Sequence, residues 1–314
     1  MRILVVGAGA IGGYFGGRLL NAGRDVTFLV RPRRAAELAQ TGLAIRSRFG
    51  DVDRAAPPTV TAENLDGVFD LILLSCKAYD LAGAAGSFAP AIGSGTAILP
   101  LLNGIGHLDE LAARFGDGHL LGGLCMISTT LDTDGQVLHL NDIHALTFGE
   151  LDGAVSARAQ AVAATMAAAG FEMRLSPAIL QEMWEKWVFI ATGAGITCLM
   201  RATVGDIVAA GATDLTAALL DECAAIAAAQ GFTPSEAALT RARTMFTAPG
   251  SGLAASMLRD IERGGPTEAD HVLGDLIRRG GEKGIRAPLL GIAYAHLKAY
   301  EARRARELAA RPAA

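Results

Sequence analysis

Three glycines near the start of the chain have a spacing that suits phosphate binding. They stand at Gly7, Gly9 and Gly12, directly after the apolar run Ile3–Val6. A strand, a glycine turn and a helix N-terminus together turn backbone N–H groups and the positive end of a helix dipole toward an anion. The first glycine permits the turn, the second lets phosphates approach, and the third lets helix and strand pack closely. The predicted pyrophosphate-binding residues are Gly7, Ala8, Gly9, Ala10, Ile11 and Gly12.

Two other readings of this stretch compete with a dinucleotide site. The chain has 38 glycines, so the motif could be an ordinary tight turn. Met1 and Arg2 before an apolar run could also open a signal peptide, but glycines interrupt that run and no small-residue cleavage site follows. A second predicted strand, Asp25–Val30, supports the strand–turn–helix context that dinucleotide binding requires.

Arginines after this second strand favour NADP(H) as the cofactor. An acidic residue at this place would accept hydrogen bonds from the ribose 2′-OH of NAD, whereas arginine pairs with the 2′-phosphate of NADP. Arg31 ends the strand, Arg33 and Arg34 follow, and no Asp or Glu lies between Val26 and Arg34. The alternative is a solvated helix start, because surface arginines are common.

Two further strand ends carry candidate polar groups. The apolar run Asp70–Ser75 leads to Lys77, and Ala97–Leu102 leads to Asn103. The carboxyl ends of parallel strands line the cofactor crevice in this class of fold, so both residues are candidates for cofactor binding and Asn103 also for substrate binding. The alternatives are a loop lysine without a role and a turn asparagine.

The chain changes character near residue 177. Strands and helices alternate up to that point, whereas predicted helices fill the remainder. The expected hairpin at Asp134-Gly135 joins Ile127–Leu131 to Gln136–Leu140, and Leu146–Gly149 is expected as a separate strand. We therefore predict an α/β fold, with a Rossmann-type dinucleotide-binding domain at residues 1–176 and an all-α substrate and catalytic domain at residues 177–314.

The helical domain offers two groups for proton transfer. Lys186 leads into the apolar, glycine-containing segment Val188–Met200, where partial desolvation would make a lysine readier to give up its proton. Glu268 is expected in the first turn of a helix that starts at Pro266 or Thr267. An exposed lysine and a helix-capping glutamate are the ordinary alternatives, and the sequence leaves open whether the two side chains meet.

Composition limits the kinds of partner. The net charge is −4 and no basic block precedes the tail, which argues against a nucleic-acid partner. The four cysteines lack metal-ligand spacing, so no metal is expected. Scattered free thiols are typical of a reducing compartment, so we expect a cytoplasmic location. The longest uncharged apolar run is too short to span a bilayer. A helical domain rich in Ala and Leu could bury one face against a second copy, which leaves a homodimer open.

Taken in order, these motifs resemble those of the ketopantoate reductase (2-dehydropantoate 2-reductase) family over about the whole chain. The resemblance implies reduction of a 2-oxo acid to a 2-hydroxy acid with NADPH, as in ketopantoate to pantoate in pantothenate biosynthesis. It further implies that Lys186 is the general acid, that Glu268 is its partner and touches the cofactor, and that Asn103 and Ser256 touch cofactor or substrate. The motifs that carry the resemblance are Gly7-x-Gly9-x-x-Gly12, Arg31, Ser75-Cys-Lys77-Ala, Asn103-Gly104-x-Gly106, Trp184-x-Lys186, Ser256-Met-x-x-Asp260 and Thr267-Glu268-x-Asp270.

The chain departs from the family pattern where substrate hydroxyls would bind. Ile190 and Ala194 stand four and eight residues after the lysine, where the family places asparagines, and apolar Val204 and Leu273 replace two more. An apolar site cannot demand a hydroxyl, so we expect weak activity on ketopantoate and preference for a more apolar 2-oxo acid or other carbonyl compound. A non-catalytic NADP-binding sensor is opposed by the retained Lys186 and Glu268. Oxidation of a hydroxy acid with NAD is disfavoured by Arg31.

Overall fold

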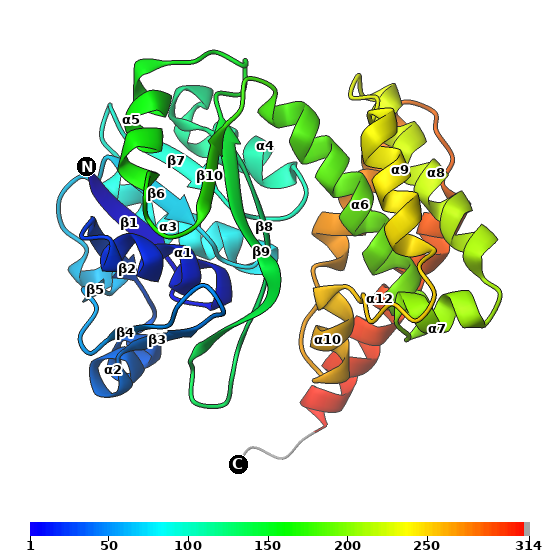
Figure 1. Ribbon diagram of the computed structural model, residues 1–314, viewed down its shortest axis with the longest axis horizontal. Helices are drawn as coiled ribbons and strands as arrows, with labels where there is room; N and C mark the ends of the chain where they lie inside the picture. Colours follow the sequence, from blue (N-terminus) through cyan, green and yellow to red (C-terminus); the bar gives the residue numbers. More distant parts are fainter. Residues whose placement is uncertain (311–314) are drawn as a thin grey trace. The chain divides into compact units, whose positions relative to one another are not determined.

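The computed structural model describes residues 1–310 and divides into two compact units. The first unit covers Met1–Leu180, and the second begins at Gln181. This division falls inside a long helix, close to the domain boundary that we predict at residue 176. Figure 1 shows that β10 is the last labelled strand and that the labelled elements after it are all helices. The α/β fold class predicted from the sequence is confirmed.

A parallel sheet of five strands forms the centre of the first unit, in the order β5-β2-β1-β6-β7. Because β1 lies between β2 and β6, the chain reverses its direction of winding next to β1, and ligands bind at such a switch point beyond the carboxyl ends of the strands. The bounds are β1 (Arg2–Val6), β2 (Asp25–Leu29), β5 (Thr59–Val60), β6 (Leu71–Leu74) and β7 (Ala97–Pro100).

The central strands are apolar because both faces of this sheet are covered. All four residues of β6 and of β7 are buried, as expected for parallel strands between helices. Helix α1 packs closely on the sheet because Gly16 takes a place where a Cβ would lie inside 3.0 Å of the Phe28 ring. Gly17 allows the same approach to Ile45 of the second sheet.

A second sheet, in the order β10-β9-β3-β4 with β8 paired to β9, completes this unit. The predicted hairpin turn at Asp134-Gly135 is confirmed, but the prediction of Leu146–Gly149 as a separate strand is wrong, because these residues continue the strand that begins at Val137. Asn141 lies within this continuous strand, and its side chain accepts the Ser128 N–H at an irregularity in the ladder. The bounds are β3 (Leu43–Arg46), β4 (Val52–Arg54), β8 (Gly122–Leu131), β9 (Val137–Gly149) and β10 (Glu172–Leu175).

Helices connect the strands of the first unit. Their bounds are α1 (Ala10–Asn21), α2 (Pro32–Thr41), α3 (Leu81–Phe88), α4 (Gly106–Phe115) and α5 (Ala157–Met166), with short 3-10 turns η1 (Ala62–Asn64), η2 (Ala78–Asp80), η3 (Ala89–Ala91) and η4 (Asp117–His119).

The second unit is helical throughout its described residues. The bounds are α6 (Ile179–Met200), α7 (Val204–Ala209), α8 (Thr213–Ala229), α9 (Glu236–Phe246), α10 (Ser256–Glu262), the π turn η5 (Asp270–Gly274), α11 (Asp275–Glu282) and α12 (Pro288–Ala309). No helix in residues 1–310 is both long and apolar enough to cross a membrane.

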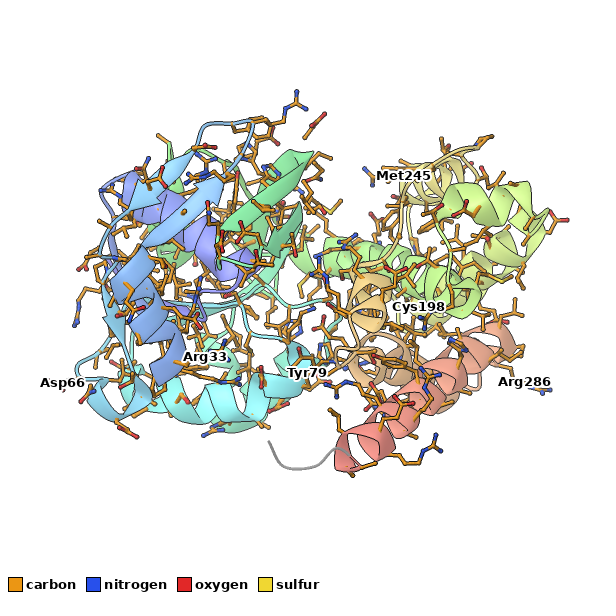
Figure 2. The ribbon with its side chains drawn as sticks, turned by 90° about the horizontal axis from the view of Figure 1, so that it is seen from below. Arg33, Asp66, Tyr79, Cys198, Met245 and Arg286 are labelled. Atoms are coloured by element: carbon orange, nitrogen blue, oxygen red, sulfur yellow. The ribbon has the colours of Figure 1, made fainter. Side chains whose placement is uncertain are left out.

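The long helix α6 is the core of the second unit. Its glycines let other helices approach, since a Cβ on Gly195 would lie inside 3.0 Å of Leu219 on α8, and one on Gly193 would crowd the Phe246 ring on α9. Cys198, labelled in Figure 2, is buried in the same helix. Burial raises the pKa of the Cys198 thiol to about 12, which keeps it protonated and unreactive at neutral pH.

Candidate functional site

The glycine motif forms the predicted strand–turn–helix. Gly7 ends β1 with a positive φ of 94°, a conformation that favours glycine, and its N–H donates to the Leu29 carbonyl at 2.9 Å. Gly9 is the N-cap of α1. A Cβ on Gly9 would meet nothing within 4 Å, so the turn leaves open space beside its backbone at a helix N-terminus. This arrangement fits the pyrophosphate of a dinucleotide, which needs backbone N–H groups and close approach.

Gly12, by contrast, permits close packing between the start of α1 and the residues around it. A Cβ there would lie inside 3.0 Å of the Gly7 carbonyl oxygen and of Ser75 Oγ. Ser75 follows β6 and donates its hydroxyl to the Val6 carbonyl oxygen at 3.0 Å. The turn after β1 is therefore fixed on one side by its own helix and on the other by the neighbouring strand. The sequence placed Ser75 in a motif but gave no sign of this contact.

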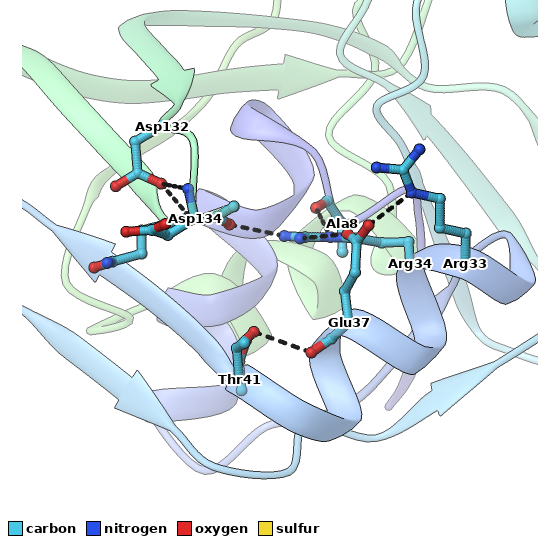
Figure 3. Close-up of polar contacts among 10 residues, drawn as sticks. Ala8, Arg33, Arg34, Glu37, Thr41, Asp132 and Asp134 are labelled. Carbon is cyan, nitrogen blue, oxygen red and sulfur yellow. Dashed lines mark hydrogen bonds and ion pairs between the residues drawn. The ribbon is translucent and has the colours of Figure 1, made fainter. Parts of the chain in front are cut away.

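Arg34 supports the same turn from α2. Its guanidinium donates to the Ala8 carbonyl oxygen at 3.2 Å and to the Gly135 carbonyl oxygen at 3.0 Å, as Figure 3 shows. Arg34 also lies 3.3 Å from Glu37, which pairs with Arg33 at 2.9 Å. Hydrogen bonds from Arg33 and Arg34 lower the pKa of Glu37. Of the three clustered arginines, Arg34 thus bonds two backbone carbonyls as well as Glu37, and it holds the glycine turn to the tip of the β8–β9 hairpin.

Arg31 is the exposed arginine at the end of the second strand. It is the N-cap residue of α2, and its side chain is 78% exposed. Its guanidinium lies 2.7 Å from Asp80 Oδ1. Asp80 comes after β6 and precedes α3, so no inspection of the residues around β2 could reveal this acid. The sequence therefore missed a carboxylate next to the predicted 2′-phosphate ligand.

Lys77 and Asn103 stand at the ends of neighbouring strands, as predicted. Lys77 follows β6 and is the N-cap residue of η2, and Asn103 follows β7 in the loop before α4. Both are partly exposed. Since β6 and β7 are adjacent and parallel, their carboxyl ends share one edge of the sheet with the glycine turn. Their roles remain predictions.

Lys186 lies in the first part of α6, between two anchored tryptophans. Trp187 is fully buried and donates its indole N–H to the Val272 carbonyl oxygen at 2.8 Å. Trp184 is buried and stacks on Phe232 with ring centroids 5.4 Å apart. Lys186 itself is partly exposed, and among residues 1–310 its ammonium has no hydrogen-bond or ion-pair partner. The two tryptophans therefore anchor the helix on either side of Lys186.

Glu268 stands just before a helix rather than in its first turn, so that expectation is wrong. The π turn Asp270–Gly274 follows it, and the Glu268 carbonyl accepts the Val272 N–H at 2.9 Å. Spacing rules for α-helices could not reveal a turn with one extra residue. Glu268 is only 8% exposed. Because Trp187 donates to Val272, the helix of Lys186 and the turn of Glu268 are bonded to each other within the second unit.

Helix α12 fixes the start of this turn through an ionic network. Tyr294 donates to Asp270 at 2.6 Å, and Lys298 bridges Asp270 and Glu301 at 2.9 and 2.7 Å. Thr267 donates to the other oxygen of Glu301. Hydrogen bonds to Glu301 and Asp270 raise the pKa of Lys298, so the network remains charged at neutral pH. Thr267 and Asp270, on either side of Glu268, are therefore both tied to one helix.

The predicted substrate residues differ in exposure. Ile190 is partly exposed, but Ala194 is 4% exposed and packs inside the unit. Ser256 is exposed at the start of α10, and the adjacent Ala255 N–H donates to Thr197 of α6 at 3.3 Å. Val204 and Leu273, the other positions that depart from the family pattern, are buried. Within residues 1–310 no group of three His, Cys, Asp or Glu side chains is placed to hold a metal ion.

Comparison with known proteins covers both units. Residues 3–153 match the family model described as Ketopantoate reductase PanE/ApbA, and residues 178–301 match its C-terminal counterpart. The "Uncharacterized oxidoreductase YkpB" of Bacillus subtilis is 39% identical over 305 residues, which cover 96% of this chain and 99% of the relative.

Solved structures share the fold. A 2-dehydropantoate 2-reductase from Methylococcus capsulatus is 29% identical, with a TM-score of 0.86 over 97% of this chain and 98% of that one. A D-mandelate dehydrogenase with NADH and anilino(oxo)acetate is 24% identical, with a TM-score of 0.87 over 97% of this chain and 100% of that one. The second likeness shows that the fold is shared with an enzyme that takes NADH.

Proposed function

Because the chain belongs to the ketopantoate reductase family of oxidoreductases, we propose that it reduces the ketone of a 2-oxo acid to a 2-hydroxy acid with NADPH. The observation that carries this proposal is the bond from Trp187 to Val272, which joins the helix of Lys186 to the turn of Glu268. This bond supports the proposal because it ties the helix that carries the proposed acid to the turn that follows its proposed carboxylate partner.

The glycine turn would hold the pyrophosphate, and Arg31, Lys77 and Asn103 would contact the rest of the cofactor. When bound, NADPH supplies the hydride that the ketone carbon receives. Lys186 orients the carbonyl oxygen by a hydrogen bond and donates a proton to it, so the product carries a hydroxyl and the lysine becomes neutral. An ammonium without a competing partner is well suited to stabilise the negative charge that develops on this oxygen. Glu268 favours return of the lysine to its charged form.

The apolar replacements favour a substrate without the hydroxyl of ketopantoate. Ile190 is the partly exposed member of this set, and it offers a substrate dispersion contacts instead of hydrogen bonds. An aryl or alkyl 2-oxo acid would suit it better than a hydroxylated one. The D-mandelate dehydrogenase structure, which holds anilino(oxo)acetate, indicates that this fold can accommodate an aryl group. Ketopantoate remains the competing substrate.

Lys186→Ala tests the reaction, with Lys283→Ala as the matched control because Lys283 is an exposed lysine of the same unit. We expect the Lys186 variant to lose at least about a hundredfold in kcat, the usual scale of a general acid. Its NADPH affinity by fluorescence titration should stay near that of the parent protein. Equal turnover in both variants would contradict the assignment of Lys186. Reduction of none of a panel of 2-oxo acids by the parent protein would favour the NADP-binding sensor.

Steady-state rates for ketopantoate, phenylglyoxylate and branched-chain 2-oxo acids test the proposed substrate class. We expect the higher kcat/KM for an apolar member of this panel. Ile190→Asn should raise kcat/KM for ketopantoate relative to phenylglyoxylate. If ketopantoate is clearly the best substrate of the parent protein, the apolar-substrate proposal is wrong, while the reductase proposal stands.

A further inference from the structure

Two charged side chains of opposite sign stand together at the carboxyl edge of the parallel sheet. Arg31 follows β2 and Asp80 follows β6, the two strands that flank β1. Their side chains meet at 2.7 Å, although 49 residues separate them along the chain. The glycine turn follows β1, so the pair spans the ends of the two strands on either side of that turn.

The Arg31–Asp80 pair is open to solvent, which leaves it accessible to a ligand. The Arg31 side chain is 78% exposed and that of Asp80 is 37% exposed. Exposed ion pairs contribute little to stability because water screens the two charges. A 2′-phosphate could therefore displace the carboxylate from the guanidinium at small cost. The displaced carboxylate would still lie close to the phosphate, and like charges repel.

We infer that Asp80 moderates the choice between NADPH and NADH at Arg31, an inference that rests on the proposed function. An arginine alone at this place favours a 2′-phosphate, whereas a carboxylate accepts a hydrogen bond from a free ribose 2′-OH. The Arg31–Asp80 pair offers both the guanidinium and the carboxylate at one place. The affinity of the chain for NADPH therefore exceeds its affinity for NADH by less than it would with Arg31 alone, and the chain still binds NADH. Asp80 is a specificity-determining residue that the sequence around β2 does not reveal.

Among residues 1–310, the other two arginines of the cluster, Arg33 and Arg34, do not pair with an acid from another part of the sheet edge. Arg33 is paired with Glu37 one turn along its own helix, and Arg34 is bound to backbone carbonyls. Figure 2 labels Arg33 and Tyr79, both exposed at the surface of the first unit. Of the three clustered arginines, only Arg31 has an ion pair with an acid that reaches it from another strand.

Asp80→Asn tests the inference by equilibrium binding. It keeps the size of the side chain and removes its charge, and Asp53→Asn is the matched control because Asp53 pairs with Arg46 on the exposed second sheet of the same unit. We expect Asp80→Asn to raise the ratio of NADPH to NADH affinity about threefold to tenfold, the combined scale of a lost repulsion and a lost ribose contact. The Asp53 variant should leave this ratio unchanged.

A fragment pair without nicotinamide separates binding from turnover. Calorimetric titration with adenosine 2′,5′-bisphosphate and with AMP should show the same change in ratio, because these two ligands differ only in the 2′-phosphate. Arg31→Ala should lower the ratio, and Asp80→Asn should have little further effect in the Arg31→Ala background, since the two residues act together.

Failure of this inference can be told from failure of the proposed function. If the parent protein binds NADPH and NADH but Asp80→Asn leaves their ratio unchanged or lowers it, Asp80 does not oppose the phosphate and the inference is wrong. If the parent protein binds neither cofactor, the proposed function fails as well.

Discussion

Two substitutions, Gly9→Ala and Gly12→Ala, should affect different properties of the protein: the first its cofactor binding, the second its stability. A methyl group on Gly12 would lie inside 3.0 Å of the Gly7 carbonyl oxygen and of Ser75 Oγ, and a backbone carbonyl cannot rotate away. Overpacking of this kind costs about 1–3 kcal/mol, and the backbone neighbour places Gly12→Ala near the upper end. We expect its thermal transition to fall by roughly 5–10 °C.

Gly9→Ala should leave folding nearly intact. Gly9 has a φ of −84°, which any residue adopts, and a Cβ there would meet nothing within 4 Å. Loss of a favourable N-cap residue costs at most about 1 kcal/mol. The methyl group would occupy the space in which the phosphates approach the backbone, so NADPH affinity should fall at least about tenfold.

Differential scanning fluorimetry and NADPH titration of the same samples provide the assay. Gly291→Ala is the control, because this glycine of α12 also has open space where a Cβ would lie. It should keep NADPH affinity and lose no stability. Parent-like NADPH binding by Gly9→Ala would refute the assignment of the glycine turn as the phosphate site. A parent-like transition for Gly12→Ala would refute the close packing that the structure shows at that glycine.

Two other predictions concern hydrogen bonds. Trp187→Phe leaves the buried Val272 carbonyl without its donor, which should cost about 1–3 kcal/mol in urea unfolding. It should also lower kcat more than the control Trp184→Phe, which shortens a buried ring that stacks on Phe232. Equal losses of kcat in the two variants would show that the Trp187–Val272 bond does not position the turn that follows Glu268. A hydrogen bond from Arg158, at 2.6 Å, lowers the pKa of Glu150 despite the opposing effect of burial. Stability from this pair is therefore present above the unfolded-state pKa and is lost as pH falls through the lower folded-state value. Glu150→Gln should be less stable than the parent protein at pH 7, and the gap should close on acidification. A gap that does not change with pH would contradict the ion-pair explanation.

The fold was largely predictable because its signals are local. Glycine spacing, apolar runs and the change at residue 177 each depend on neighbouring residues, and the fold class deduced from them is confirmed. Strand β9 is continuous where the sequence predicted two strands, Gln136–Leu140 and Leu146–Gly149, on either side of Asn141. In the structure its side chain supplies a hydrogen bond that carries the ladder across an irregularity.

The site was predictable only in part, because its decisive contacts join distant segments. Lys186 and Glu268 could be proposed from the sequence, but the bond between the helix of Lys186 and the turn that follows Glu268 spans 85 residues. The Asp80 carboxylate reaches Arg31 from a different strand. Contacts of this kind depend on sheet order and helix packing, and no spacing rule within one segment encodes them.

The π turn after Glu268 has a consequence for how this chain tolerates changes in its length. An α-helix advances about 100° for each residue, so loss of one residue within Asp270–Gly274 would turn Glu268 by that angle about the helix axis. Helix α11 could keep its place, since Gly280 is already packed against Ile226 of α8. A deletion here would also displace the buried Val272 and Leu273 and the hydrogen bond from Trp187, so it should lower stability as well as move Glu268. In an evolving lineage, one lost codon at this turn would therefore change the position of Glu268 and the packing of the second unit together.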